Sequence, residues 1–94
     1  MELYVNNVFV QNISELSFDA NIMIDKNISN FLELKENNVV KSKYLILPND
    51  INDSHNNLLF CLDGDVYQSC LPWKIFLKKI NDNMFIKHID ITLY

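Results

Sequence analysis

The chain has 94 residues, of which 49% are hydrophobic and 21% are charged, and its formal net charge at pH 7 is −4. This length is enough for one small hydrophobic core, and the composition is that of a globular domain rather than a disordered segment. All eight basic residues are lysines, and the single glycine, Gly64, excludes the glycine-rich loops that bind nucleotide phosphates. Because nucleic-acid-binding proteins need a basic surface, usually with arginine, this composition argues against a nucleic-acid partner. We therefore expect one non-catalytic domain over residues 1–94.

The apolar segments bear on the location of the protein in the cell. The longest, Tyr44–Leu47 and Leu58–Leu62, are far too short to cross a bilayer. The N-terminus also lacks the basic and then apolar pattern of a secretory signal peptide. We therefore expect a cytoplasmic protein.

The first element along the chain is a predicted β-hairpin over Leu3–Val10. Its centre is Asn6-Asn7, and asparagine tolerates the positive φ angles that a two-residue hairpin turn requires. In this hairpin Tyr4 lies opposite Phe9, which is a favourable aromatic pair.

Three further segments are predicted before residue 50. Ser17–Ile24 alternates apolar and polar residues, which predicts a strand. Phe31–Leu34 is a short apolar segment that ends at a polar break over Lys35–Asn38. Lys43–Leu47 predicts another strand, and it ends at Pro48 because proline has no amide donor.

The strongest hairpin signal lies in the middle of the chain, where Leu58–Leu62 and Asp65–Ser69 flank an Asp-Gly pair. In this register Cys61 lies opposite Val66, and Cys70 lies well away from both. A disulfide would therefore need a different register, so we expect two reduced thiols, as in a reducing compartment.

The segment Pro72–Asn81 fits two structures. Four apolar residues recur at helical spacing: Trp73, Phe76, Leu77 and Ile80. Proline also suits the first turn of a helix. The alternative is a strand and then a turn at Asn81–Asn83. A final strand follows over Met84–Tyr94, in which Ile86 and Ile89 lie on opposite faces.

About seven extended segments at intervals of about ten residues predict a mainly β fold. The fold that we expect is a small β-sandwich. The alternative is an α+β domain with one helix at about 72–81.

Few residues point to catalysis or to metal binding. His55 follows Asp53 and Ser54 in a polar loop, but sequence neighbours rarely have triad geometry. With only one other histidine, His88, and no Cys-x-x-Cys pair, a zinc site has little support. The acidic loop also lacks the glycine and the terminal glutamate of a calcium-binding loop. We therefore expect no catalytic, cofactor-binding or metal-binding residues, and no small-molecule substrate.

A lysine cluster beside Trp73 and Phe76 suggests a contact surface for a protein partner. The same pattern fits a solvated strand or helix face whose apolar members belong to the core. The candidate partner contacts are Asp53, His55, Lys74, Lys78 and Lys79.

The middle of the chain resembles a forkhead-associated (FHA) domain. Ser42–Asp53 is similar to an FHA strand and the acidic loop after it, and His55 follows Ile51 at the expected distance of four residues. The Leu58–Gln68 hairpin is similar to the next FHA hairpin. Over residues 30–94 the chain is most similar to the cytoplasmic FHA-like domain of the type III secretion inner-membrane ring proteins, the YscD/EscD/PrgH family.

The chain departs from the FHA domains that bind phosphothreonine. Glu36-Asn37 stands near the position of their Gly-Arg pair, and Asn52 replaces the serine that lies three residues before the loop histidine. Their Asn-Gly pair does not occur in this sequence. Phosphate recognition also favours arginine, which the chain lacks.

The resemblance therefore implies a non-catalytic scaffold without phosphothreonine recognition. Such a scaffold would contact sorting-platform proteins at the cytosolic face of a bacterial inner membrane, as an oligomer within a ring. It would reach the membrane only through a span beyond Tyr94, outside this chain. The alternative function is a small acidic inhibitor or immunity protein, from a phage or toxin cassette, that masks a basic site on its target.

Overall fold

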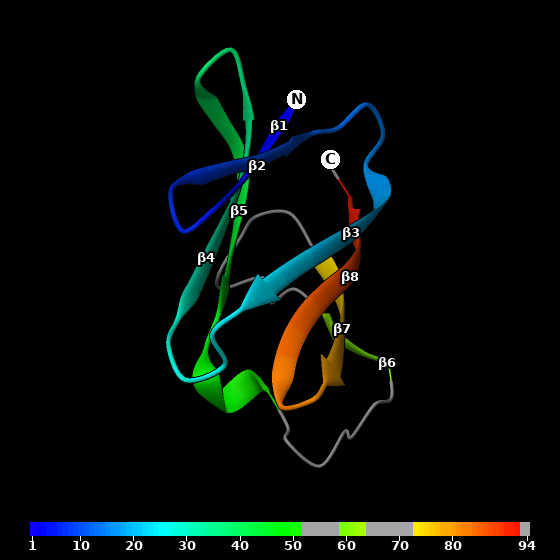
Figure 1. Ribbon diagram of the computed structural model, residues 1–94. Helices are drawn as coiled ribbons and strands as arrows, with labels where there is room; N and C mark the ends of the chain where they lie inside the picture. Colours follow the sequence, from blue (N-terminus) through cyan, green and yellow to red (C-terminus); the bar gives the residue numbers. More distant parts are fainter. Residues whose placement is uncertain (52–58, 64–72, 93–94) are drawn as a thin grey trace.

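The computed structural model describes residues 1–51, 59–63 and 73–92, which form two antiparallel four-stranded sheets (Figure 1). The elements are β1 (Glu2–Val5), β2 (Val8–Asn12), β3 (Ser17–Ile24), β4 (Asn30–Glu36), β5 (Val39–Ile46), the short helix η1 (Pro48–Asp50), β6 (Leu59–Asp63), β7 (Trp73–Ile80) and β8 (Asn83–Ile91). The first sheet has the order β2-β1-β4-β5, and the second sheet has the order β3-β8-β7-β6. The predicted mainly β fold, a small β-sandwich, is confirmed.

Tight turns of asparagine and aspartate connect three of the hairpins. They are Asn6-Asn7, Asn37-Asn38 and Asn81-Asp82, with φ angles between 50° and 66°. Positive φ at both central residues is the requirement of a type I′ turn, and short Asx side chains meet it at low cost. The hairpin over residues 3–10 is confirmed, with the rings of Tyr4 and Phe9 in edge contact at 5.8 Å.

The second of these turns corrects a prediction. Within the polar break over Lys35–Asn38, the first two residues extend β4 and Asn37-Asn38 form a tight hairpin turn. Strand β5 therefore begins at Val39 rather than at Lys43. Its first residues are exposed, and they therefore lack the apolar alternation that marks the second half of the strand.

The segment 73–80 is a strand, so the helix at 72–81 is wrong and the alternative of strand, turn and strand is confirmed. Trp73, Ile75 and Leu77 are fully buried at a spacing of two residues, whereas Phe76 is half-buried on the other side of the strand. A helix would bring Phe76 and Leu77 to the same face. The burial of every second residue, which is typical of a strand, therefore describes this segment, and the helical spacing of its apolar residues does not.

Strand β6 pairs with β7, with Asp63 opposite Lys74. The hairpin predicted from the Asp-Gly pair would place Asp65–Ser69 beside this strand as well. Those residues lie outside the part of the chain that the structure describes, and so does Cys70.

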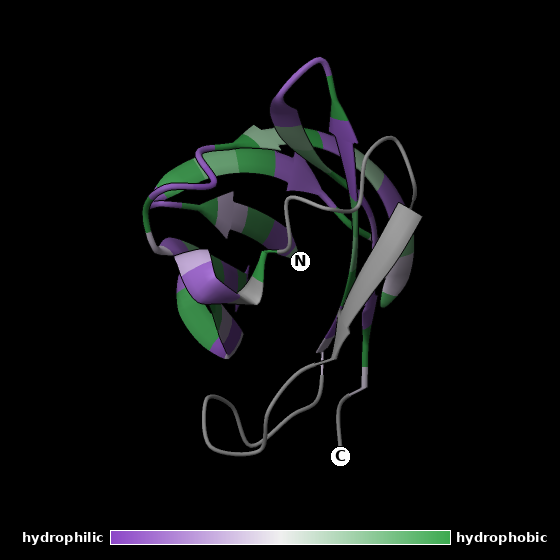
Figure 2. Cartoon of the chain, turned by 90° about the horizontal axis from the view of Figure 1, so that it is seen from below, coloured by the Kyte–Doolittle hydropathy of each residue, from purple (hydrophilic) through white to green (hydrophobic). Residues whose placement is uncertain are grey.

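The core lies between the two sheets and is made of alternating inward residues. Buried residues recur at every second position in β1, in the second half of β5 and in the first half of β7. Both hydrophobic and hydrophilic residues lie along the strands (Figure 2). Trp73 of β7 is fully buried, and its indole N–H donates to Ser42 Oγ of β5 at 2.5 Å. The ring also stacks on Tyr44 of β5, with centroids 6.2 Å apart, so these side chains join the two sheets. The only helix in the described part of the chain, η1, is too short to span a membrane.

Strand β8 contains a bulge that places the polar residues of the second sheet. Its pairing with β7 shifts between His88 and Ile86, and Lys87 has no partner residue. Ile86 and Ile89 are therefore both fully buried, although strict alternation predicted opposite faces for them. The extra residue of the bulge leaves Lys87 and His88 on the outer side of the sheet.

Candidate functional site

Four polar side chains lie together on the outer face of the second sheet. Ser17 and Asp19 come from β3, and His88 and Asp90 come from β8. The register places Ser17 opposite Asp90 and Asp19 opposite His88. Residues two apart on a strand share a face, so these two cross-strand pairs lie side by side. We call these four residues the His88 cluster.

The histidine ring of the cluster is bonded on both sides. His88 Nδ1 lies 2.8 Å from Asp19 Oδ1, and Nε2 lies 2.7 Å from Asp90 Oδ1. Ser17 Oγ donates to Asp90 Oδ1 at 2.5 Å and lies 3.2 Å from His88 Nε2. Ionised carboxylates only accept hydrogen bonds, so this geometry suits a ring that donates from both nitrogens. The cluster therefore favours the positively charged imidazolium.

Hydrogen bonds within the cluster shift the pKa values of His88 and Asp90 in opposite directions. The hydrogen bond with Asp19, opposed by desolvation and aided by Asp90, raises the pKa of His88 above its ordinary value of 6.5. The hydrogen bond from Ser17, followed by the contact with His88, lowers the pKa of Asp90 below 3.8. The charged pair therefore persists over a wider pH range than the free side chains would allow.

The cluster contains the residue types of a serine-histidine-aspartate triad, but its hydrogen bonds differ. A triad histidine accepts the serine proton at an unprotonated Nε2. Here Nε2 faces the carboxylate of Asp90, and the Ser17 hydroxyl donates to Asp90 rather than to the ring. This arrangement holds a proton and is not set up to remove one. In the described part of the chain, no three His, Cys, Asp or Glu side chains are placed to hold a metal ion.

Aromatic and basic side chains of β7 and β8 continue the same face. Phe76 is opposite His88, with the two rings in edge contact at 5.5 Å. Lys74 is opposite Asp90, and its charge contributes to the lowered pKa of that carboxyl. Farther along β8, Phe85 is half-buried.

Two lysines lie near Phe85. Lys78 is opposite it in register. The ammonium of Lys87 lies 5.9 Å from the centre of the Phe85 ring and donates to Asn21 Oδ1 at 2.7 Å. The outer face of the second sheet is thus a mixed surface of aromatic rings and charges.

Of the five predicted partner contacts, two lie on this face, one does not, and two lie outside the described residues. Lys74 and Lys78 both lie on the outer face of β7. Lys79 does not join them, because its side chain is only 13% exposed and forms an ion pair with Asp82 at 3.7 Å. Asp53 and His55 lie outside the described residues.

The sequence draws attention to His88 as one of two histidines, but its partners Ser17, Asp19 and Asp90 were not predicted. The signal is present as two short patterns, Ser17-x-Asp19 and His88-x-Asp90, in which polar residues two apart share a strand face. The patterns become a site only when the two strands pair in the observed register. That register is set by residues about 70 positions apart.

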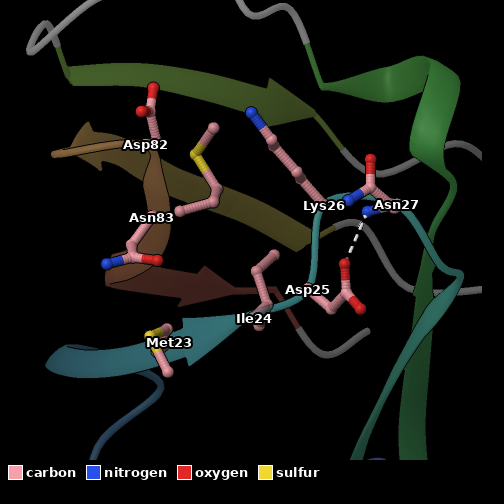
Figure 3. Close-up of a pocket in the computed structure, with 8 residues that line it drawn as sticks. Met23, Ile24, Asp25, Lys26, Asn27, Asp82 and Asn83 are labelled. Carbon is pink, nitrogen blue, oxygen red and sulfur yellow. Dashed lines mark hydrogen bonds between the residues drawn. The ribbon is translucent and has the colours of Figure 1, made fainter.

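A second feature is a cavity of about 310 Å³ between the β3–β4 connection and the β7–β8 turn (Figure 3). Ile24 and Met84 line it together with Asp25, Lys26 and Asp82. Asp25 accepts the backbone N–H of Asn27 at 2.9 Å, and Asp82 pairs with Lys79. Each of these carboxylates therefore has a partner within three residues of it in the sequence.

Compared with known proteins, the chain matches no family model, no curated protein and no solved structure.

Proposed function

We propose that this chain is a non-catalytic protein-interaction domain whose partner binds the outer face of the second sheet. One observation carries the proposal, namely that an acidic chain has a locally basic face here. Along β3, β7 and β8 the face carries four side chains that can be cationic, Lys74, Lys78, Lys87 and His88, against two carboxylates, Asp19 and Asp90. The register adds one more acidic residue, Asp63 of β6 opposite Lys74, and the cationic groups still outnumber the acidic ones. The chain as a whole has a net charge of −4.

The aromatic residues of this face support the same reading. Phe76 and Phe85 are half-buried between the charged groups, and Met23 opposite Phe85 is 63% exposed. Aromatic and methionine side chains are enriched at the centre of protein interfaces, with charged groups at the rim. A partner that presents an apolar centre and acidic side chains would complement this surface.

The location of the binding surface can be tested by photo-crosslinking in the native host. A crosslinking amino acid at Phe76 should capture the partner. The matched control is Phe31 of β4, which is also half-buried but alternates with the core residues Leu32 and Leu34 and so faces outward from the first sheet. Equal capture from both positions, or capture from Phe31 alone, would contradict the proposed surface.

The charge complementarity is tested with the purified partner. Lys74→Gln with Lys78→Gln should weaken binding by about five- to tenfold, as expected for two exposed charges. Lys41→Gln with Lys43→Gln removes the same charge from two exposed residues of β5 and should leave the affinity unchanged. The same loss in both double variants would mean that only the net charge of the chain matters.

In its finer form, the proposal follows the resemblance to the FHA-like domain of the type III secretion inner-membrane ring. The captured partner would then be a sorting-platform protein. Capture of a basic toxin or enzyme, with binding lost in 300 mM salt, would instead favour the acidic inhibitor, because salt screens exposed charge pairs at this concentration.

A further inference from the structure

We infer that His88 is a protonation-controlled staple that holds the edge strand β3 against β8. Strand β3 lies at the edge of the second sheet and pairs only with β8 in the described part of the chain. Its register slips between Asp19 and Ile22, so the backbone pairing is interrupted in the middle of the strand. The half that contains Ser17 and Asp19 is thus a short ladder, bounded by this slip and by the hydrogen bond from the Ile91 backbone N–H to the Leu16 carbonyl at 2.8 Å. Side-chain contacts across this short ladder add to its few backbone hydrogen bonds.

Those contacts converge on His88. The ring binds Asp19 of β3 through Nδ1 and Asp90 of its own strand through Nε2. Asp90 in turn accepts the hydroxyl of Ser17 on β3. One ring thus connects both cross-strand pairs of this half of β3.

Loss of the ring proton breaks this connection. A neutral imidazole has one N–H and one lone pair, so only one of the two carboxylates can keep its hydrogen bond. The other would face a lone pair at under 3 Å. Asp19 and Asp90 would also lose the cation that lies between them, and like charges on neighbouring strands repel.

The charged groups around the ring fix the direction of the effect. Asp19 faces the ring from β3, and Asp90 and Lys87 lie on the same strand as His88. On the β7 side, Lys74 lies opposite Asp90, and the uncharged Phe76 lies opposite the ring. The two carboxylates are in direct contact with the ring, and the pKa of His88 is raised. The staple is therefore complete below pH 6.5 and is lost as the pH rises through the pKa of the folded state.

The test is a titration of the full chain by NMR, with amide hydrogen exchange measured at pH 6 and pH 8.5. The ring of His88 should titrate above 6.5. After correction for the intrinsic rate, exchange at Ser17–Asp19 should be about two- to fivefold faster at pH 8.5, the scale of an exposed ion pair. Exchange in β1 and β4 should not change. Titration of His88 at or below 6.5 would overturn the inference.

Two variants separate the staple from a general effect of pH. His88→Gln removes the titrating group, so the pH dependence at Ser17–Asp19 should disappear, whereas His55→Gln, which removes the other histidine of the chain, should keep it. If His88→Gln does not fold, Asp19→Asn leaves the ring in place and should lower its titration midpoint. Unchanged pH dependence in the folded His88 variant, or an unchanged midpoint in Asp19→Asn, would contradict the staple.

Discussion

At the scale of single residues, a buried hydrogen bond from Trp73 to Ser42 connects the two sheets. Both side chains are almost completely removed from solvent, at 0% and 5% exposure. A buried donor that loses its acceptor cannot bond to water instead. Removing one partner of the hydrogen bond therefore costs more stability than the bond itself contributes, and removing the second partner as well adds little further cost.

The variants Ser42→Ala and Trp73→Phe should therefore not be additive. Each should lower the free energy of unfolding by about 1–3 kcal/mol, since each leaves one buried polar group unpaired. The double variant should lose less than the sum of the two. Urea unfolding of all three variants should be followed by circular dichroism rather than by tryptophan fluorescence, because Trp73→Phe removes the only tryptophan of the chain. Ser29→Ala, at an exposed position, is the control. Strict additivity would contradict a direct contact.

The carboxyl of Asp90 should make the stability of the fold depend on pH in the acidic range. Its lowered pKa means that it stabilises the fold above pH 3.8, and that this contribution is lost as the pH falls through the pKa of the folded state. Thermal unfolding should therefore separate the wild type from Asp90→Asn at pH 6, and the difference should shrink at pH 3. Glu36→Gln, an exposed change at the end of β4, is the control. A difference that is constant with pH would exclude the carboxylate as its source.

At the scale of elements, pairs of asparagine or aspartate residues form the turns of three hairpins. The first was predictable because strong apolar strands flank it on both sides. The second was not, because exposed Val39, Val40 and Lys41 follow it and hide the start of β5. The bulge at Lys87 was equally hidden. The alternation of β8 looks regular within each half of the strand, and the change of face depends on the neighbouring strands.

The turn Asn37-Asn38 allows a direct test of this account. Asn38 has a φ of 64°, which costs a residue with a Cβ atom about 1–2 kcal/mol unless its side chain is of the Asx type. Asn38→Ala should lower the unfolding temperature, and Asn38→Gly should preserve or raise it, because Asn-Gly is a preferred type I′ pair. Asn49→Ala, at an exposed position in η1, should have little effect. Equal losses for Asn38→Ala and Asn38→Gly would mean that backbone strain is not the cause.

At the scale of the whole molecule, the spacing of extended segments was enough to predict a small sandwich of two sheets. The order of strands was not predictable in the same way. The pairing of β6 with β7, and of β3 with β8 across most of the chain, depends on contacts between segments that are separated in sequence. The His88 cluster follows from the second of these pairings, so sequence alone indicated its residues but not their convergence.

The whole-molecule charge pattern predicts that the chain does not bind phosphothreonine peptides. Phosphate recognition relies on charge-assisted donors, best supplied by arginine forks, and this chain has lysines only. Calorimetric titration with a phosphothreonine peptide should show no binding, with its unphosphorylated form as the control. An FHA domain that carries the Gly-Arg, Ser-x-x-His and Asn-Gly pattern serves as the positive control. Micromolar affinity would contradict this prediction. If such binding vanished in Lys74→Gln with Lys78→Gln, the phosphate would be held by the outer face of the second sheet rather than by loops.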